Sequence, residues 1–169
     1  MTREELEKII LDFMDSLNTA TLACSSEDEP WSAPVYYARQ GFDLIFFSSR
    51  KSRHSGLFQA NPRAAASIYG LYQSWQDIRG LQMSGRVEAL TSLPAIARGA
   101  NTYFRRFPFA RDFFSKSGFL SDALAKTTRI ALYSFRTSSV HYLDNSVGFG
   151  IRWKLDIQEG RPIGSPEHS

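Results

Sequence analysis

The chain has 169 residues, of which 43% are hydrophobic and 22% are charged. This length and composition are typical of one folded domain and exclude a disordered or fibrous protein. A formal net charge of +3 at pH 7 is too small to indicate a class of partner. The single cysteine, Cys24, excludes an intrachain disulfide and a cysteine-rich metal framework.

The N-terminal segment is acidic and lacks the basic start and apolar run of a signal peptide. No apolar stretch of the sequence is long enough to cross a membrane. We therefore expect a cytoplasmic protein without a membrane partner.

The first expected element is a helix that ends near Ser16. Thr2 and Glu5 have the spacing of a capping box, and apolar residues then recur at helical spacing from Leu6 to Leu17. Three β-rich runs follow at 19–25, 31–38 and 42–48, and their order predicts three consecutive antiparallel strands. Pro34 removes a backbone donor from the second run, which predicts an edge position or a bulge there.

Residues 52–60 have a helical pattern that Asn61 and Pro62 end, and 64–69 and 77–90 are expected strands. Gly80 and Gly85 in the long strand predict bulges or a close approach of another backbone. A second helix with Pro94 in its first turn is expected to end at Pro108, before a short helix and loop at 109–120 and strands at 129–135 and 139–143.

This clustering of strands predicts a mainly β fold, an antiparallel barrel with peripheral helices, and disfavours an alternating parallel α/β fold. We expect a single domain over residues 1–158. The remaining residues, 159–169, are expected to form a flexible C-terminal tail.

Residues 46–54 carry the most informative pattern, in which an apolar strand ends in a hydroxyl-rich, basic turn that leads into a helix. Free backbone N–H groups at a helix start, hydroxyls and guanidinium groups are the donors that bind a phosphate dianion. The alternative interpretation is a solvated basic loop between two elements.

The run 46–62 resembles the segment of pyridoxamine 5'-phosphate oxidase in which an aromatic-hydroxyl pair ends a strand, Ser-Arg-Lys opens a helix and Asn-Pro closes it. Residues 105–108 and 144–153 resemble an uncharacterised bacterial branch of the same FMN-binding split-barrel superfamily. The resemblance spans most of residues 19–153. It implies an antiparallel split β-barrel with peripheral helices, assembled as a homodimer with FMN at the subunit interface.

The resemblance also assigns cofactor-binding residues. Phe47 and Ser48 match the aromatic-hydroxyl pair, and Ser52, Arg53 and His54 fall on the positions that hold the FMN phosphate. In the same turn, Ser49 and Lys51 are further candidates. Gln82 matches the long central strand that lines the flavin, and we expect it either to contact the flavin ring or to be a surface glutamine.

The function implied by the resemblance is a flavin-dependent oxidoreductase acting on a small molecule. No catalytic side chain is assigned, because the flavin itself supplies the redox chemistry. His54 stands where the family has lysine, and the second strand lacks the family's basic ligands. These departures keep open an alternative, a non-enzymatic ligand-binding or sensing module that has lost FMN and takes another ligand, such as haem or a deazaflavin.

The basic, aromatic segment 103–116 has two interpretations. Its cations and rings would suit a nucleic-acid surface. Helical spacing of the rings favours instead a buried or dimer-forming apolar stripe with arginines at its solvated edge, and we expect no nucleic-acid partner. The histidines lack metal-ligand spacing, so no metal site is expected.

Overall fold

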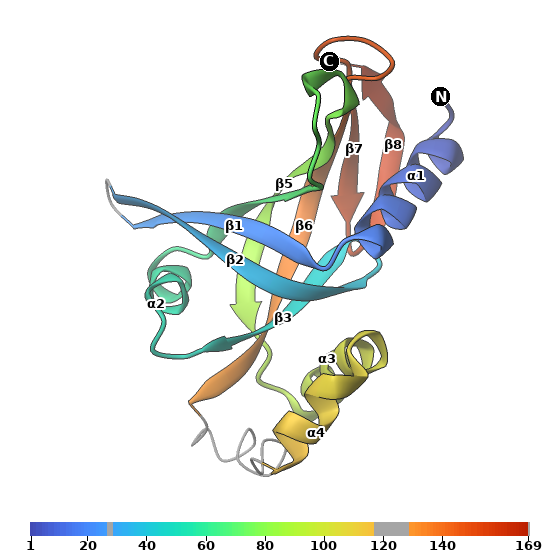
Figure 1. The fold of residues 1–169 in the computed structure, drawn as a ribbon. Coiled ribbons are helices and arrows are strands. Elements are labelled where there is room, and N and C mark those ends of the chain that lie inside the picture. Colours follow the sequence, from blue (N-terminus) through green and yellow to red (C-terminus); the bar gives the residue numbers. More distant parts are fainter. Residues whose placement is uncertain (27–28, 117–128, 169) are drawn as a thin grey trace.

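The computed structural model describes residues 1–26, 29–116 and 129–168 (Figure 1). The helices are α1 (Arg3–Ser16), α2 (Arg53–Ala60), α3 (Leu93–Arg106) and α4 (Pro108–Lys116), with a 3₁₀ turn at Trp75–Asp77. The strands are β1 (Thr19–Ser26), β2 (Glu29–Gln40), β3 (Asp43–Ser49), β4 (Arg63–Tyr69), β5 (Arg79–Ala89), β6 (Ile130–Asp144), β7 (Arg152–Gln158) and β8 (Arg161–His168).

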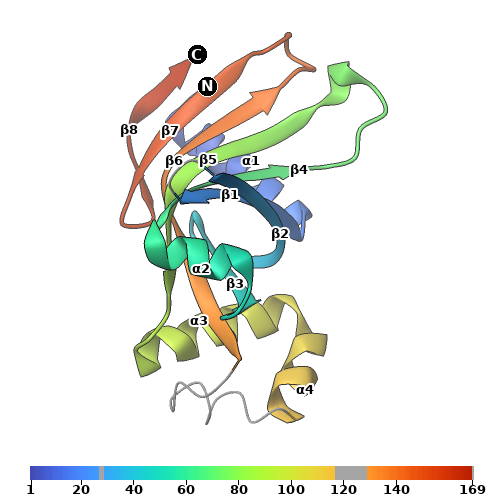
Figure 2. The ribbon, with the colours of Figure 1, turned by 90° about the vertical axis from the view of Figure 1, so that its left-hand side faces the viewer.

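The strands form one antiparallel sheet in the order β3-β2-β1-β4-β5-β6-β7-β8, and an additional pairing of β3 with β6 closes the first six into a barrel. β7 and β8 extend the sheet beyond the barrel. Figures 1 and 2 place them at the opposite end of the molecule from α3 and α4. The expected mainly β barrel with peripheral helices is confirmed.

The main core fills the barrel and is covered on one side by α1. The capping box of Thr2 and Glu5 opens α1, and the helix buries Leu6, Ile10 and Met14 against the sheet. The capping box and the buried apolar face both match the predictions from the sequence. Inside the barrel, the largest fully buried side chains include Tyr37, Phe46 and Phe135.

A second core lies between the barrel and the two helices α3 and α4. Tyr103, Phe107 and Phe114 of these helices bury their rings with Ala38 of β2, and Phe47 of β3 packs against them. Three rings of the apolar stripe expected in segment 103–116 are therefore buried within this chain, whereas Phe109 is exposed.

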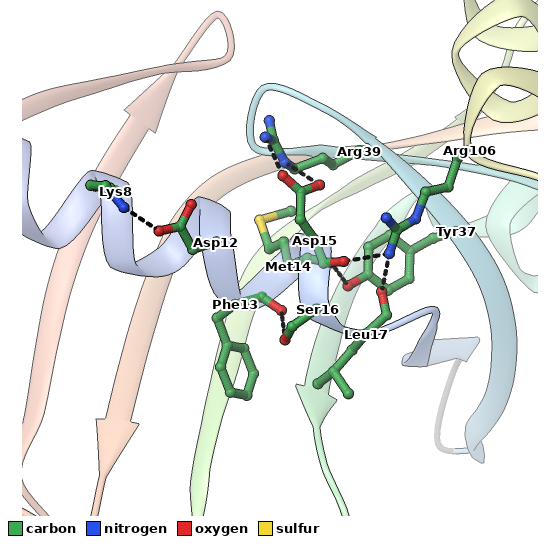
Figure 3. A network of polar contacts seen from close by, with 10 residues as sticks. All are labelled: Lys8, Asp12, Phe13, Met14, Asp15, Ser16, Leu17, Tyr37, Arg39 and Arg106. Carbon is green, nitrogen blue, oxygen red and sulfur yellow. Dashed lines mark hydrogen bonds and ion pairs between the residues drawn. The ribbon is translucent and has the colours of Figure 1, made fainter.

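The C-terminal end of α1 is fixed by side chains from β2 and α3 (Figure 3). Arg39 binds the Asp15 carboxylate with two contacts of 2.8 and 2.5 Å, and the Tyr37 hydroxyl donates to the Met14 carbonyl at 2.7 Å. Arg106 donates to the carbonyl of Asp15 and to Asn18 Oδ1, the latter at 2.9 Å. The last carbonyls of a helix have no intrahelical donors. Arg106 is thus a helix cap rather than part of the expected solvated edge.

Two further differences concern the C-terminal strands. A single strand, β6, covers both expected strands because its first half pairs with β3 and its second half with β7. Glu159 and Gly160 adopt positive φ values of 52° and 75°, which turn the chain back on itself. Arg161–His168 then pairs with β7 as β8, where the sequence pattern suggested a flexible tail.

The special positions of Pro34 and Gly85 behave as the sequence predicts. Pro34 pairs only with Thr21 of β1, because β2 pairs with β3 from Tyr37 onward. The register of β5 against β6 shifts between Ser84 and Gly85, which marks a β-bulge. Among the described helices, none is long and apolar enough to cross a membrane.

Candidate functional site

The turn between β3 and α2 is built from serine side chains. The backbone N–H of Ser52 donates to the Ser49 carbonyl at 3.0 Å, which closes a four-residue turn, and the N–H of Lys51 donates to Ser49 Oγ at 3.2 Å. Ser52 is the N-cap of α2, since its Oγ accepts from the N–H of Ser55 at 3.3 Å. A serine at this position is what starts the helix.

Three polar side chains converge where α2 begins: Ser48, Ser52 and His54, here named the Ser48 cluster. Ser48 Oγ lies 2.6 Å from His54 Nε2 and 3.2 Å from Ser52 Oγ. The first N–H groups of a helix have no intrahelical acceptor, and the helix dipole makes this end positive. The cluster therefore combines hydroxyl donors, an imidazole and a helix N-terminus, a donor set that fits a phosphate group.

Basic side chains flank the cluster. Lys51 is exposed and Arg50 is half-buried, and within the described part of the chain Arg50 Nε is buried without a hydrogen-bond partner. The Arg53 guanidinium stacks 4.2 Å from the centre of the Trp31 ring and forms an ion pair with Glu29. Both members of this pair are substantially exposed, and such surface pairs stabilise a protein by at most about 1 kcal/mol. A phosphate could compete with Glu29 for Arg53.

The imidazole of His54 is half-buried between Ser48 and the ring of Phe58, whose centre lies 5.8 Å away. Burial lowers the pKa of His54 from its ordinary value of 6.5 because charging the ring there costs solvation. At neutral pH the ring is uncharged, so it supplies a hydrogen bond but no positive charge to the site.

This lowered pKa predicts a pH dependence of stability. The unfolded chain binds a proton at His54 at a higher pH than the folded chain does, so the free energy of unfolding should decrease as pH falls below 6.5. Urea unfolding between pH 7 and pH 5 measures it, and His54→Gln should remove part of the slope. An identical slope in both proteins would contradict the assignment.

Phe47 lies apart from the Ser48 cluster because successive side chains of a strand face opposite sides of the sheet. Its ring centre is 4.8 Å from that of Tyr103, 5.9 Å from that of Phe104 and 4.2 Å from that of Phe114. Among the residues that the sequence grouped as cofactor ligands, Phe47 is thus a packing residue of the second core. Ser49 stays in the turn, where it accepts hydrogen bonds from Lys51 and Ser52.

Gln82 is also remote from the Ser48 cluster. It lies exposed on β5, opposite Ser67 of β4 and His141 of β6. These residues line a hollow of about 380 Å³ on the outer face of the barrel, floored by Ala23 and small neighbours. The structure thus brings together Ser48, Ser52 and His54, with Lys51 and Arg53 beside them, and leaves Phe47 and Gln82 elsewhere.

Sequence reasoning missed Glu29 and Trp31 as neighbours of the site. Both belong to β2 and reach Arg53 across 24 and 22 positions of the chain, respectively. No local pattern carries this contact, since it depends on how α2 lies against the β1–β2 hairpin.

Comparisons with known proteins bear on the family and the fold. Residues 6–126 match the family described as pyridoxamine 5'-phosphate oxidase. A UPF0306 protein of Photorhabdus laumondii is 24% identical over 153 residues, covering 89% of this chain and 95% of its own.

Solved structures share the fold. A heme-binding protein from Mycobacterium smegmatis has a TM-score of 0.67 at 18% identity, over 90% of this chain and 57% of its own, so this chain spans little more than half of that protein. A FAD-binding protein from Mesorhizobium loti has a TM-score of 0.61 at 21% identity, over 83% of this chain and 94% of its own. With its barrel of antiparallel strands and a family match over more than half its length, the chain belongs to the pyridoxamine 5'-phosphate oxidase family and has the split-barrel fold.

Proposed function

We propose that this protein binds FMN, with the phosphate at the N-terminus of α2. The observation that carries the proposal is the convergence of Ser48, Ser52 and His54 there, with Ser48 Oγ 2.6 Å from His54 Nε2. Ser48 and Ser52 donate hydroxyl hydrogen bonds to phosphate oxygens, and the helix end adds N–H groups. Lys51 and Arg53 supply the positive charge that the neutral imidazole does not.

The flavin ring lies between two copies of the chain in this proposal, and Gln82 contacts it from one of them. The outer face around Gln82 supports an interface, because Thr21 and Ser67 beside it are small and uncharged. Depletion of charged residues is typical of the buried centre of an interface. The proposed assembly is a cytoplasmic homodimer.

The proposed activity is a flavin-dependent oxidoreduction of a small molecule. Bound FMN would supply the hydride or electron transfer, and the chain would hold the phosphate, orient the ring and limit access of water. The Ser48 cluster performs the first task, and Gln82 offers an amide to the ring. The protein with a similar fold that is described as FAD-binding supports a flavin-type ligand.

The absorbance spectrum of the purified protein tests the proposal directly. It is recorded before and after addition of FMN and removal of the excess by gel filtration. Flavin bands near one FMN per chain are expected. A protein that stays colourless at micromolar FMN would overturn the assignment.

Replacing Arg53 by alanine should weaken FMN binding by about 1.5 to 3 kcal/mol, because one charge-assisted hydrogen bond to the phosphate is lost. Glu29→Gln is the matched control, since it breaks the same Arg53–Glu29 ion pair but keeps the guanidinium. Fluorescence titration of FMN should show weaker binding for Arg53→Ala only. Equal affinities for the two variants would place the phosphate elsewhere.

A second candidate function is a ligand-binding or sensing module on the same barrel. It is favoured by the internal partners that Arg53 and His54 already have, in Glu29 and Ser48. The protein with a similar fold that is described as heme-binding adds support for a different ligand. Anaerobic addition of NADH or NADPH to the flavin-loaded protein separates the two functions, since bleaching of the flavin band indicates an oxidoreductase and an unchanged band indicates a module.

A further inference from the structure

A row of three arginines crosses the outer face of the barrel. Arg63 of β4 lies directly opposite Arg86 of β5, and Arg86 lies directly opposite Arg136 of β6. Residues opposite each other on antiparallel strands point to the same side of the sheet, with their Cβ atoms about 5 Å apart. The three guanidinium groups therefore leave the same face.

Among the described residues, two acidic side chains, Asp43 and Glu88, bind this row, and both bind Arg136. Its Nη1 lies 2.8 Å from Asp43 Oδ2 and its Nε lies 2.8 Å from Glu88 Oε1. Within the described part of the chain, the guanidinium groups of Arg63 and Arg86 make no ion pair or hydrogen bond. Like charges directly opposite each other destabilise a sheet. Arg63 and Arg86 thus carry positive charge that nothing in the described chain neutralises.

The two arginines border a hollow of about 720 Å³. Its floor is made of small side chains on adjacent strands, among them Ala23, Ala65 and Ser84. Gly85 also lines the hollow, at the bulge of β5 against β6. The hollow is therefore a built feature of the sheet and not a gap between mobile chains.

Two other polar side chains of the hollow, those of Asn61 and Ser138, are held in place by hydrogen bonds. The Asn61 side chain donates to the Ser25 carbonyl at 3.2 Å and accepts from the N–H of Arg63 at 3.2 Å. Ser138 Oγ donates to the Ser84 carbonyl at 3.0 Å. These bonds fix the walls, so the two arginines are the groups free to bind a ligand.

We infer that this hollow is a second anion site, in which Arg63 and Arg86 bind the phosphate groups of a small organic phosphate whose uncharged part lies on the alanine and serine floor. Arginine suits this role because its planar fork donates two parallel hydrogen bonds to phosphate oxygens. Asn61 places the site at the C-terminal end of α2, whereas the Ser48 cluster lies at the N-terminal end. The inference does not depend on FMN binding.

Titration calorimetry with inorganic pyrophosphate at low ionic strength tests the site. Arg86→Gln should weaken pyrophosphate binding about tenfold or more, because charge-assisted hydrogen bonds are lost. Without pyrophosphate, the same variant should melt at a temperature up to about 3 °C higher, because the repulsion from Arg63 and Arg136 is relieved. A solvated arginine without a ligand role would not produce the loss of binding.

Two controls make the result specific. Arg98→Gln removes the same charge from an exposed position on α3 and should leave pyrophosphate affinity unchanged. Ser52→Ala removes a hydroxyl of the Ser48 cluster. It should weaken only pyrophosphate bound at that cluster and leave the binding event that depends on Arg86 unchanged. Equal loss in Arg98→Gln would indicate unspecific charge attraction, and loss only in Ser52→Ala would assign the pyrophosphate to the Ser48 cluster. If Arg86→Gln changes the oligomeric state in solution, measured as the mass of the assembly by light scattering, a second copy of the chain fills the hollow. Each of these outcomes would overturn the inference.

Discussion

Replacement of Gly85 by alanine should lower the free energy of unfolding by about 3 kcal/mol or more, because the new methyl group has no room. A Cβ at this position would lie 2.2 Å from the carbonyl oxygen of Arg136 and 2.9 Å from Cζ of Phe135. The carbonyl belongs to the backbone of β6 and cannot rotate away as a flexible side chain can. Either β5 separates from β6 or the bulge is lost.

Urea unfolding followed by circular dichroism measures this loss. Gly56→Ala is the control, since a Cβ there meets no atom within 4 Å and the residue lies inside α2. Alanine in a helix interior should stabilise the protein by about 0.5 to 1 kcal/mol relative to glycine. Equal stability of Gly85→Ala and the unchanged protein would mean that the bulge is not where the structure places it.

The barrel could be predicted because each strand carries its own signals. Turn residues and the change from helical to β-rich composition separated 19–25, 31–38 and 42–48, and these runs became β1, β2 and β3 with bounds that differ by at most two residues. The closure of β3 on β6 could not be predicted from local patterns. It joins residues such as Phe46 and Tyr133, which are far apart in the sequence. The β8 strand was missed because its sequence, with Pro162, Gly164 and Pro166, has little strand character.

Within the candidate site, the sequence located the helix start correctly. Ser52 has the residue type and position of an N-cap, and the structure confirms that its Oγ caps α2. The sequence could not predict the side of the sheet to which Phe47 points. Phe46 and Phe47 are adjacent and both aromatic, so either ring could have faced the barrel interior. Phe46 enters the barrel and Phe47 enters the second core, and this is possible because α3 and α4 cover the outer side of β3.

Replacement of Phe47 by alanine should therefore destabilise the protein by about 2 to 4 kcal/mol while leaving the proposed FMN phosphate site intact. The ring stacks 4.2 Å from Phe114 of α4 and meets Tyr103 of α3 edge-on at 4.8 Å. Its removal takes away a contact that joins both helices to the barrel. If the helices move in to fill part of the space, the loss lies toward the lower end of this range. Ser48→Ala should have the opposite profile, with weaker FMN binding.

Thermal unfolding and FMN titration of both variants measure these two profiles. Phe109→Ala is the matched control for truncation of a phenylalanine, because this ring of α4 is 69% exposed. It should change the free energy of unfolding by less than about 0.5 kcal/mol. Loss of FMN binding by folded Phe47→Ala, with stability close to that of the unchanged protein, would show that the ring serves the cofactor as the family resemblance implies. Loss of stability with unchanged FMN affinity would assign Phe47 to the scaffold. If the ring also contacted FMN, its removal would weaken FMN binding as well.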